Sequence, residues 1–320
     1  MSYRIDPSAP LSLEIRRIGV EQLHEAVAIL DAGRLKRDAG AHEARKRFKR
    51  LRGLLRLIAD AAPGFRRREE QRIKEIADSL SAIRDATAMV EAIDRFVENA
   101  KKPEDLDHLM ALRRGLLARR DRILRKQSSL DATVGRATEG LHLAEKAFEK
   151  LTFPDDAAEA SELLAKSVEK TCRRARKALR KAAEKGRDAD FHALRKGVKY
   201  HEMHLQLLSD AWPAVLKERW KKAEKLGDRL GDLHDIPVLA ATIENEQIGD
   251  KADRKFVRKM MRRKHKKLSA ECLEDAGRLF HARPETVARD IAIHYALVSA
   301  DKAPVGPEPV SARKRGRAQA

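Results

Sequence analysis

Residues 41–58 read AHEARKRFKRLRGLLRLI, and they indicate the fold class that the rest of the chain follows. The apolar residues of this stretch recur at steps of three and four, which is typical of one buried face of an α-helix. A second face of the same helix carries cations almost throughout. Because like charges four residues apart weaken an isolated helix by about a few tenths of a kcal/mol per pair, such a face indicates an anionic neighbour. The cationic face comprises His42, Arg45, Lys46, Lys49, Arg52 and Arg56.

The remainder of the chain shows the same helical period, and no convincing run alternates with period 2. Pro and Gly residues separate the periodic stretches. Aromatic residues make up only 4% of the chain, which disfavours a β-sandwich or barrel. The sequence therefore predicts an all-α protein. We expect helices over residues 11–32, 41–58, 66–98, 104–127, 130–151, 157–185, 190–209, 213–227, 229–246, 252–280 and 284–299.

Composition narrows the possible partners. The 320 residues carry 69 Lys and Arg against 50 Asp and Glu, a net charge of +19. Such a surface attracts polyanions or anionic membranes. No apolar run approaches the ~18 residues of a membrane span, and two cysteines are too few for a disulfide framework. We therefore expect a cytoplasmic protein with reduced thiols and no membrane span, and its oligomeric state is left open.

An internal repeat appears when the chain is compared with itself at an offset of 150 residues. Residues 37–93 and 187–243 share 16 identities in 57 positions. The identities include charged residues, which a shared core pattern alone would not require. His42, Arg45, Lys46 and Lys49 correspond to His192, Arg195, Lys196 and Lys199. The repeat predicts two related halves that pack about a pseudo-twofold axis, with equivalent cationic helices facing each other.

The repeat also predicts the domain boundaries. We expect a first helical repeat over residues 1–152 and a second over residues 153–299, with the boundary near Phe153-Pro154. Residues 300–320 are rich in Pro, Gly, Ala and Arg, which is typical of a disordered basic tail.

Four motifs in order resemble one known family. HEARKRFKRLR at 42–52 and HALRKGVKYHEM at 192–203 resemble the paired His-x-x-Arg signatures of the CHAD domain, the conserved histidine α-helical domain. LGDLHDIPVL at 230–239 resembles the LGDLHD block of that family, and IRDATAMV at 83–90 resembles its counterpart in the first half. The resemblance covers roughly residues 10–299, and the chain lacks the ExExK signature of the CYTH domain to which the family can be fused.

The resemblance implies two pseudo-symmetric four-helix-type bundles with a basic central pore or groove between them. It also implies binding of inorganic polyphosphate and, in bacteria, association with polyphosphate granules. The chain departs from the family pattern at Glu202-Met203, where a cationic residue and an aromatic residue are usual. The second half of the site is therefore expected to be less cationic at that end.

Polyphosphate carries about one negative charge per phosphate and no base or sugar, so a binder needs a track of cations. The densest basic stretches are 42–56, 173–187 and 254–267. We expect no cofactor, no metal and no catalytic residue. The predicted polyphosphate-binding residues are His42, Arg45, Lys46, Lys49, Arg50, Arg52, Arg173, Lys177, His192, Arg195, Lys196 and Lys199.

The histidines and acids allow other roles. His42 and His192 could be metal ligands or general bases, but they lack partners of the usual type and spacing, and hydrogen bonding to phosphate or to a neighbouring Arg is favoured. Since a phosphate neighbour favours imidazolium, binding is expected to tighten as the pH falls from about 7.5 to 6. We expect Asp85 and Asp235 to hold helices together, and His201 and His204 to lie on the surface.

Two alternative functions use the same basic helices. A nucleic-acid-binding protein would use them and the tail to follow a phosphate backbone, but the basic runs contain no interleaved aromatic residues and no helix-turn-helix or zinc-finger signature is visible. A phosphohydrolase would need clustered acids to hold Mg²⁺, whereas the acids here are mostly interspersed with bases. Non-enzymatic polyphosphate binding is therefore favoured.

Overall fold

The structure, a computed structural model, describes residues 3–32, 37–125, 130–153 and 156–301, without the side chains of residues 37–39, 41–42, 82–84, 130 and 301. All regular elements in these ranges are α-helices, so the prediction of an all-α protein is confirmed. None of these helices has the length and hydropathy needed to cross a bilayer. The helices are α1 (Leu11–Asp31), α2 (Arg37–Leu57), α3 (Pro63–Ser79), α4 (Ser81–Glu98), α5 (Pro103–Arg125), α6 (Leu130–Glu149), α7 (Ala157–Lys185), α8 (Asp188–Leu207), α9 (Pro213–Asn245), α10 (Lys251–Leu279) and α11 (Pro284–Asp301).

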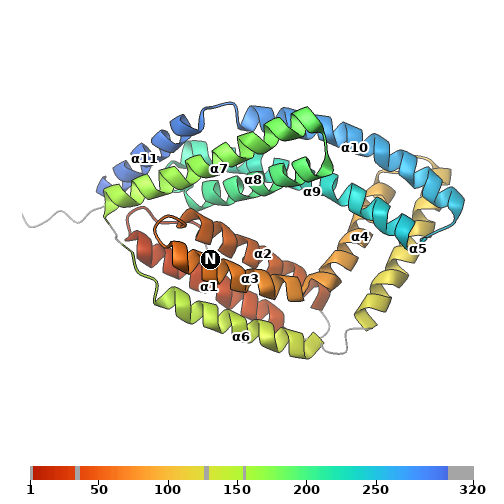
Figure 1. The fold of residues 1–320 in the computed structure, drawn as a ribbon, viewed down its shortest axis with the longest axis horizontal. Helices are drawn as coiled ribbons and strands as arrows, with labels where there is room; N and C mark the ends of the chain where they lie inside the picture. The colour runs from red at the N-terminus through yellow and green to blue at the C-terminus, as the bar shows by residue number, and fades with distance from the viewer. Residues whose placement is uncertain (1–2, 33–36, 126–129, 154–155, 302–320) are drawn as a thin grey trace, which may run out of the picture.

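Each half of the chain forms a bundle with a projecting helical hairpin (Figure 1). In the first half, α1 packs on α2 and α6, and α3 packs on α2 and α6, while α4 and α5 form the hairpin. In the second half, α7 packs on α8 and α11, α8 packs on α9, and α9 and α10 form the longer hairpin. The two hairpins meet at one end of the molecule, away from the bundles.

Contacts between the halves join helices that the sequence repeat makes equivalent. α2 contacts α8, α4 contacts α9, and α5 contacts α10. A twofold-related pair of halves produces this pattern, because elements on the axis meet their own equivalents. The duplication, the domain boundaries and the central pore stay predictions at this point.

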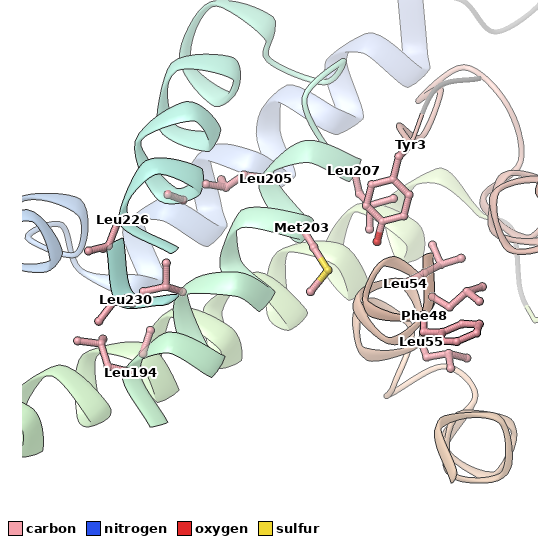
Figure 2. Close-up of a cluster of buried hydrophobic side chains, with 14 of the residues drawn as sticks. Tyr3, Phe48, Leu54, Leu55, Leu194, Met203, Leu205, Leu207, Leu226 and Leu230 are labelled. Carbon is pink, nitrogen blue, oxygen red and sulfur yellow. The ribbon is translucent and has the colours of Figure 1, made fainter. Parts of the chain in front are cut away.

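The apolar faces of the helices meet in one continuous core (Figure 2). Phe48, Leu54 and Leu55 of α2 are almost completely buried, and so is Leu194 of α8. Tyr3 lies where the two halves join, and its hydroxyl donates a hydrogen bond of 2.6 Å to the carbonyl of Arg50. Since each buried leucine contributes about 1.5–3 kcal/mol, the apolar faces hold the cationic faces in place.

The close packing of α7 against α8 depends on Gly197. A Cβ atom at this position would lie 2.9 Å from Cα of Ala175, which is backbone that cannot move aside locally. We expect Gly197→Ala to lower the free energy of unfolding by about 1–3 kcal/mol, as overpacked substitutions do. Gly277 is a matched control, because a Cβ added there would meet no atom within 4 Å. Gly277→Ala should raise the free energy of unfolding by up to about 1 kcal/mol. Urea denaturation of both variants checks this, and equal effects would contradict it.

The helix boundaries differ from the predicted ones at equivalent places in the two halves. The predicted helix 66–98 is divided at Leu80, where the Ser79 hydroxyl donates a hydrogen bond of 2.8 Å to the Ile76 carbonyl and competes with helical bonding. The predicted helices 213–227 and 229–246 are instead one helix, α9, which continues through Pro237. α11 extends to Asp301, so the first two residues of the predicted tail are helical, and the rest of the tail lies outside the described residues.

The prediction that His201 and His204 lie on the surface is wrong, because both are fully buried. His201 lies against Cys172, with 3.7 Å between Nδ1 and Sγ, and packs on the Phe280 ring. His204 Nε2 lies 3.3 Å from the Gly53 carbonyl of α2, and its Nδ1 lies 3.4 Å from the Thr171 hydroxyl of α7. Burial lowers the pKa of each histidine to about 3, so both rings are neutral near pH 7. His204 joins the two halves through Gly53, whereas the partners of His201 lie in the second half.

Candidate anion-binding site

α2 presents a row of cations beside its buried face. Arg45, Lys49, Arg52 and Arg56 follow one another at steps of four, three and four, and therefore lie on one side of the helix. Arg45 keeps about a quarter of its side chain exposed, and Lys46, one position further round, is exposed. Arg50 points elsewhere: its guanidinium lies over the Tyr3 ring, 5.3 Å from the centroid, and burial lowers its pKa.

α8 presents the matching row on the side that meets α2. The two helices touch where Gly53 packs against Met203, and where the Arg56 guanidinium lies 4.1 Å from the Tyr200 ring centroid. Counting back from Met203 at steps of four and three along α8 leads to Lys199, Lys196 and His192, so these side chains share the side that faces α2. The cations of α8 thus share a side with Met203, which touches α2, and they also contact α9, Lys199 through Gly227 and Asp228 and His192 through His234.

α4 and α9 join the halves again beyond the cationic rows (Figure 1). Arg95 of α4 pairs with Asp235 at 2.7 Å and with Asp232 at 3.2 Å, both on α9. Arg45 lies 4.0 Å from Asp85 of α4, which is mostly exposed. Asp235 therefore holds helices together, as predicted.

The LGDLHD segment of α9 supports Arg195 and His192. Gly231 leaves room for the Arg195 guanidinium, whose Nη2 would lie 3.4 Å from a Cβ at that glycine. The ring of His234 lies 4.6 Å from that of His192, centroid to centroid. Burial, followed by His234, Lys196 and Arg195, lowers the pKa of His192 to about 4.

This lowered pKa corrects the expected pH range of the histidine response. His192 is neutral throughout pH 6–7.5 in the free protein, because a cation there would be half-buried among other cations. Burial lowers the pKa of His234 as well, and Arg195 is the next cause. We therefore expect His192 to take up a proton on anion binding only below the range of about pH 7.5 to 6 that the sequence indicated. The side chain of His42 lies outside the described residues.

Several nitrogen atoms on these two rows are buried without a hydrogen-bond partner in the described structure. They are Nη1 of Arg45, Nε of Arg52 and Nε of Arg56 on α2, and Nδ1 of His192 and Nε of Arg195 on α8. A buried donor without an acceptor costs about 1–3 kcal/mol, so these side chains gain free energy when they turn toward an added acceptor. Arg47, Arg66 and Arg219 have similar atoms elsewhere, but they do not share a row.

The acids near the rows are unequally distributed. Lys199 pairs with Glu202 at 2.7 Å and lies 3.5 Å from Asp228, so its charge is balanced within the protein. Burial raises the pKa of Glu202, and Lys199 opposes that shift. Glu202 therefore lowers the net positive charge at this end of the row. Within the described side chains, no acid lies at ion-pair distance from Arg195 or Lys196.

Partners of the α2 cations come from α2 itself and from α3. Lys46 pairs with Glu43 at 2.6 Å, and both side chains are about half exposed. Glu70 of α3 lies 3.7 Å from Arg52 and 3.3 Å from Arg56. The exposed Lys46–Glu43 pair contributes about 0–1 kcal/mol, whereas Glu70 is mostly covered and connects α3 to α2.

Arg173 and Lys177 lie apart from the facing rows. α7 uses Cys172 and Ala175 to contact α8, and the other side of α7 carries Arg173 and Lys177. Arg173 pairs with Glu169 at 2.7 Å and with Glu285 of α11. Both cations line a separate pocket of about 590 Å³, together with Arg176, Leu179, Arg180, Phe280 and Pro284.

Sequence reasoning left three residues of this region out of the predicted site. Arg56 was placed on the cationic face of residues 41–58 but not among the predicted binding residues, although it continues the row of Arg45 and Arg52. His234 stands inside the LGDLHD segment, but its contact with His192 depends on how α8 and α9 pack. Arg95 carries no recognisable signal, because its partners Asp232 and Asp235 lie far away in the sequence. In the part of the chain that the structure describes, no group of three or more His, Cys, Asp or Glu is arranged to hold a metal ion.

Comparisons with known proteins agree on one family. The family profile described as the CHAD domain matches residues 20–244. The crystal structure of the CHAD domain from the plant Ricinus communis is similar to this structure, with a TM-score of 0.54 and 20% sequence identity. The match covers 87% of this chain and 94% of the plant chain, and at this identity it supports the fold alone. No curated protein sequence matches the chain.

Proposed function

The chain belongs to the CHAD family, and from this premise we propose that it binds inorganic polyphosphate between the facing cationic rows of α2 and α8. The cations on α8 that have no acid at ion-pair distance among the described side chains, Arg195 and Lys196, carry this proposal together with Arg45 and Lys46 of α2. Phosphate oxygens are strong acceptors and suit Arg in particular, since its planar fork can hold two oxygens at once. The rows come from equivalent helices, which supports a duplicated, two-sided channel for a linear anion.

Binding without catalysis is the proposed role. A phosphohydrolase needs acids that are free to hold Mg²⁺. Asp232 and Asp235 pair with Arg95, and Glu202 pairs with Lys199, so the acids next to the rows are already engaged by cations. Incubation of the protein with polyphosphate and Mg²⁺ or Mn²⁺ should therefore release no orthophosphate, and steady release would contradict this role.

Nucleic acid is a weaker candidate for the same surface. Single-strand binding uses aromatic rings on which bases stack. The tyrosines beside the rows are covered by the protein's own arginines, Tyr3 by Arg50 and Tyr200 by Arg56. A surface of cations with covered rings suits a polymer that has charge and no bases.

A competition experiment distinguishes these polymers. We expect labelled long-chain polyphosphate to remain bound when double-stranded DNA is added at equal charge concentration, because the rows can surround a thin phosphate chain but not a duplex. Fluorescence anisotropy measures the displacement, and log affinity should fall steeply with log salt as several cations are engaged. Displacement of polyphosphate by the duplex would contradict the proposal. A chain with this affinity would also gather on polyphosphate granules in cells that store them.

A further inference from the structure

A second pocket lies on the other side of α9, between α9, α10 and the start of α8. It has a volume of about 420 Å³, within the range typical of small-molecule sites. Its floor is aliphatic, and Ile243, Val257 and Met261 of that floor are almost completely buried. The other apolar lining residues are Ile236, Pro237, Ala240 and Ala241, and the charged ones are Asp188, Glu244, Arg254, Arg258, Arg262 and His265.

The floor indicates the kind of molecule that fits. No Phe, Tyr or Trp lines the pocket, and the one imidazole at its rim, that of His265, is paired with Asp188, so the floor offers a nucleobase no ring on which to stack. Aliphatic side chains instead suit an alkyl chain, whose transfer from water contributes about 0.8 kcal/mol per CH₂ group. The interior of this pocket is therefore unlike the polyphosphate surface, which is cationic throughout.

The rim indicates the charge of the molecule. Arg254, Arg258 and Arg262 follow at steps of four along α10, and form a ladder beside the opening. Arg258 pairs with Glu244, and Arg254 donates a hydrogen bond of 2.6 Å to the Gly249 carbonyl. His265 pairs with Asp188 at 3.0 Å. Arg262 is exposed and has no hydrogen-bond or ion-pair partner among the described residues, so it is the cation available for a ligand.

We propose that this pocket binds a medium-chain anionic amphiphile, with its alkyl chain on the aliphatic floor and its carboxylate or phosphate head group at Arg262. The site is separate from the polyphosphate surface and does not depend on it. α9 connects the two, since Asp232 and Asp235 hold Arg95 on one side of the helix while Ile236 and Ala240 line the pocket on another.

Isothermal titration calorimetry of the full chain tests the site with decanoate and decyl phosphate, each below its micelle concentration. We expect one molecule to bind per chain, and decanol, which lacks the charge, to bind about tenfold more weakly. Comparison of the two anions tells whether the head group is a carboxylate or a phosphate. AMP should not bind here, because the aliphatic floor offers no Phe, Tyr or Trp ring for its base.

Two variants locate the binding. Ala241 is exposed at the pocket wall, so Ala241→Phe should fill the opening without disturbing the core and should abolish decanoate binding. Arg262→Ala should weaken it about tenfold, whereas the neighbouring exposed Arg263→Ala should leave it unchanged. Binding that survives Ala241→Phe, or decanol that binds as well as decanoate, would overturn the proposal.

Discussion

The double variant Arg45→Glu/Arg195→Glu should lose nearly all affinity for long-chain polyphosphate while it keeps its fold. Each reversal removes a charge-assisted contact and adds a repulsion to a neighbouring phosphate. With about 1.5–3 kcal/mol for each lost contact, the expected loss is roughly 10²- to 10⁴-fold. Both arginines have a buried nitrogen without a partner, and Asp85, the acid nearest Arg45, is 4.0 Å away. Reversal of the two charges should therefore lower the free energy of unfolding only slightly.

A matched variant separates this site from the overall charge. Arg263→Glu/Lys266→Glu changes the net charge by the same amount, on exposed positions of α10 that are outside the rows. We expect it to bind within about threefold of the parent protein, since distant exposed charges are largely screened by salt. Fluorescence anisotropy gives both affinities, and circular dichroism confirms that both variants are folded. An equal loss in the two variants would show that net charge alone drives binding.

The helices were largely predictable from the sequence, but their breaks were not. The stripe of Ala44, Phe48 and Leu51 has the helical period and is buried as expected. At the break beside Leu80 the Ser79 hydroxyl bonds the Ile76 carbonyl, whereas the equivalent stretch of α9 has Arg229 in place of Ser79 and continues without a break. The sequence showed a pattern of helical period on both sides of each place, so it did not tell which of the two helices would continue.

The spacing in the sequence predicted which cations share a side of a helix. It did not predict which of these cations pair with acids. Helical steps identify which cations of α2 share a side. Whether a cation is balanced depends on acids that approach from elsewhere, as Glu285 of α11 approaches Arg173 of α7. The binding roles of Arg173 and Lys177 stay predictions, and they now concern a different pocket from the one between α2 and α8.

The buried histidines were misjudged for a related reason. His201 and His204 belong to a stretch with polar neighbours, and polar residues are usually exposed. His204 is buried where α2 crosses α8 and the Gly53 carbonyl comes within reach of its ring, and His201 is buried between Cys172 of α7 and the Phe280 ring. No local pattern reports such a crossing, because its two partners are 151 residues apart.

This burial leads to the second large effect, a loss of stability in mild acid. An unfolded histidine has a pKa near 6.5, while burial lowers the pKa of His201 and His204 to about 3 in the fold. Above pH 6.5 both states are neutral and the histidines' contribution is fully present. Between pH 6.5 and 3 these two histidines bind protons in the unfolded chain but not in the folded chain. The free energy of unfolding should therefore fall by up to about 1.4 kcal/mol per pH unit for each histidine.

Urea denaturation at a series of pH values measures this loss, and His201→Leu/His204→Gln isolates it. Gln can still donate to the Gly53 carbonyl, and Leu suits the space beside Phe280. The variant should lose stability at pH 7.5, yet its free energy should fall by about 2–3 kcal/mol per pH unit less steeply than that of the parent between pH 6 and 5. His192 and His234, whose pKa values are also lowered, add to the slope of both proteins equally. Parallel slopes would show that the two buried rings do not control acid stability. A shallower slope would locate the acid-sensitive point where α2, α7 and α8 meet, since His204 touches all three helices through Gly53, Thr171 and its own backbone.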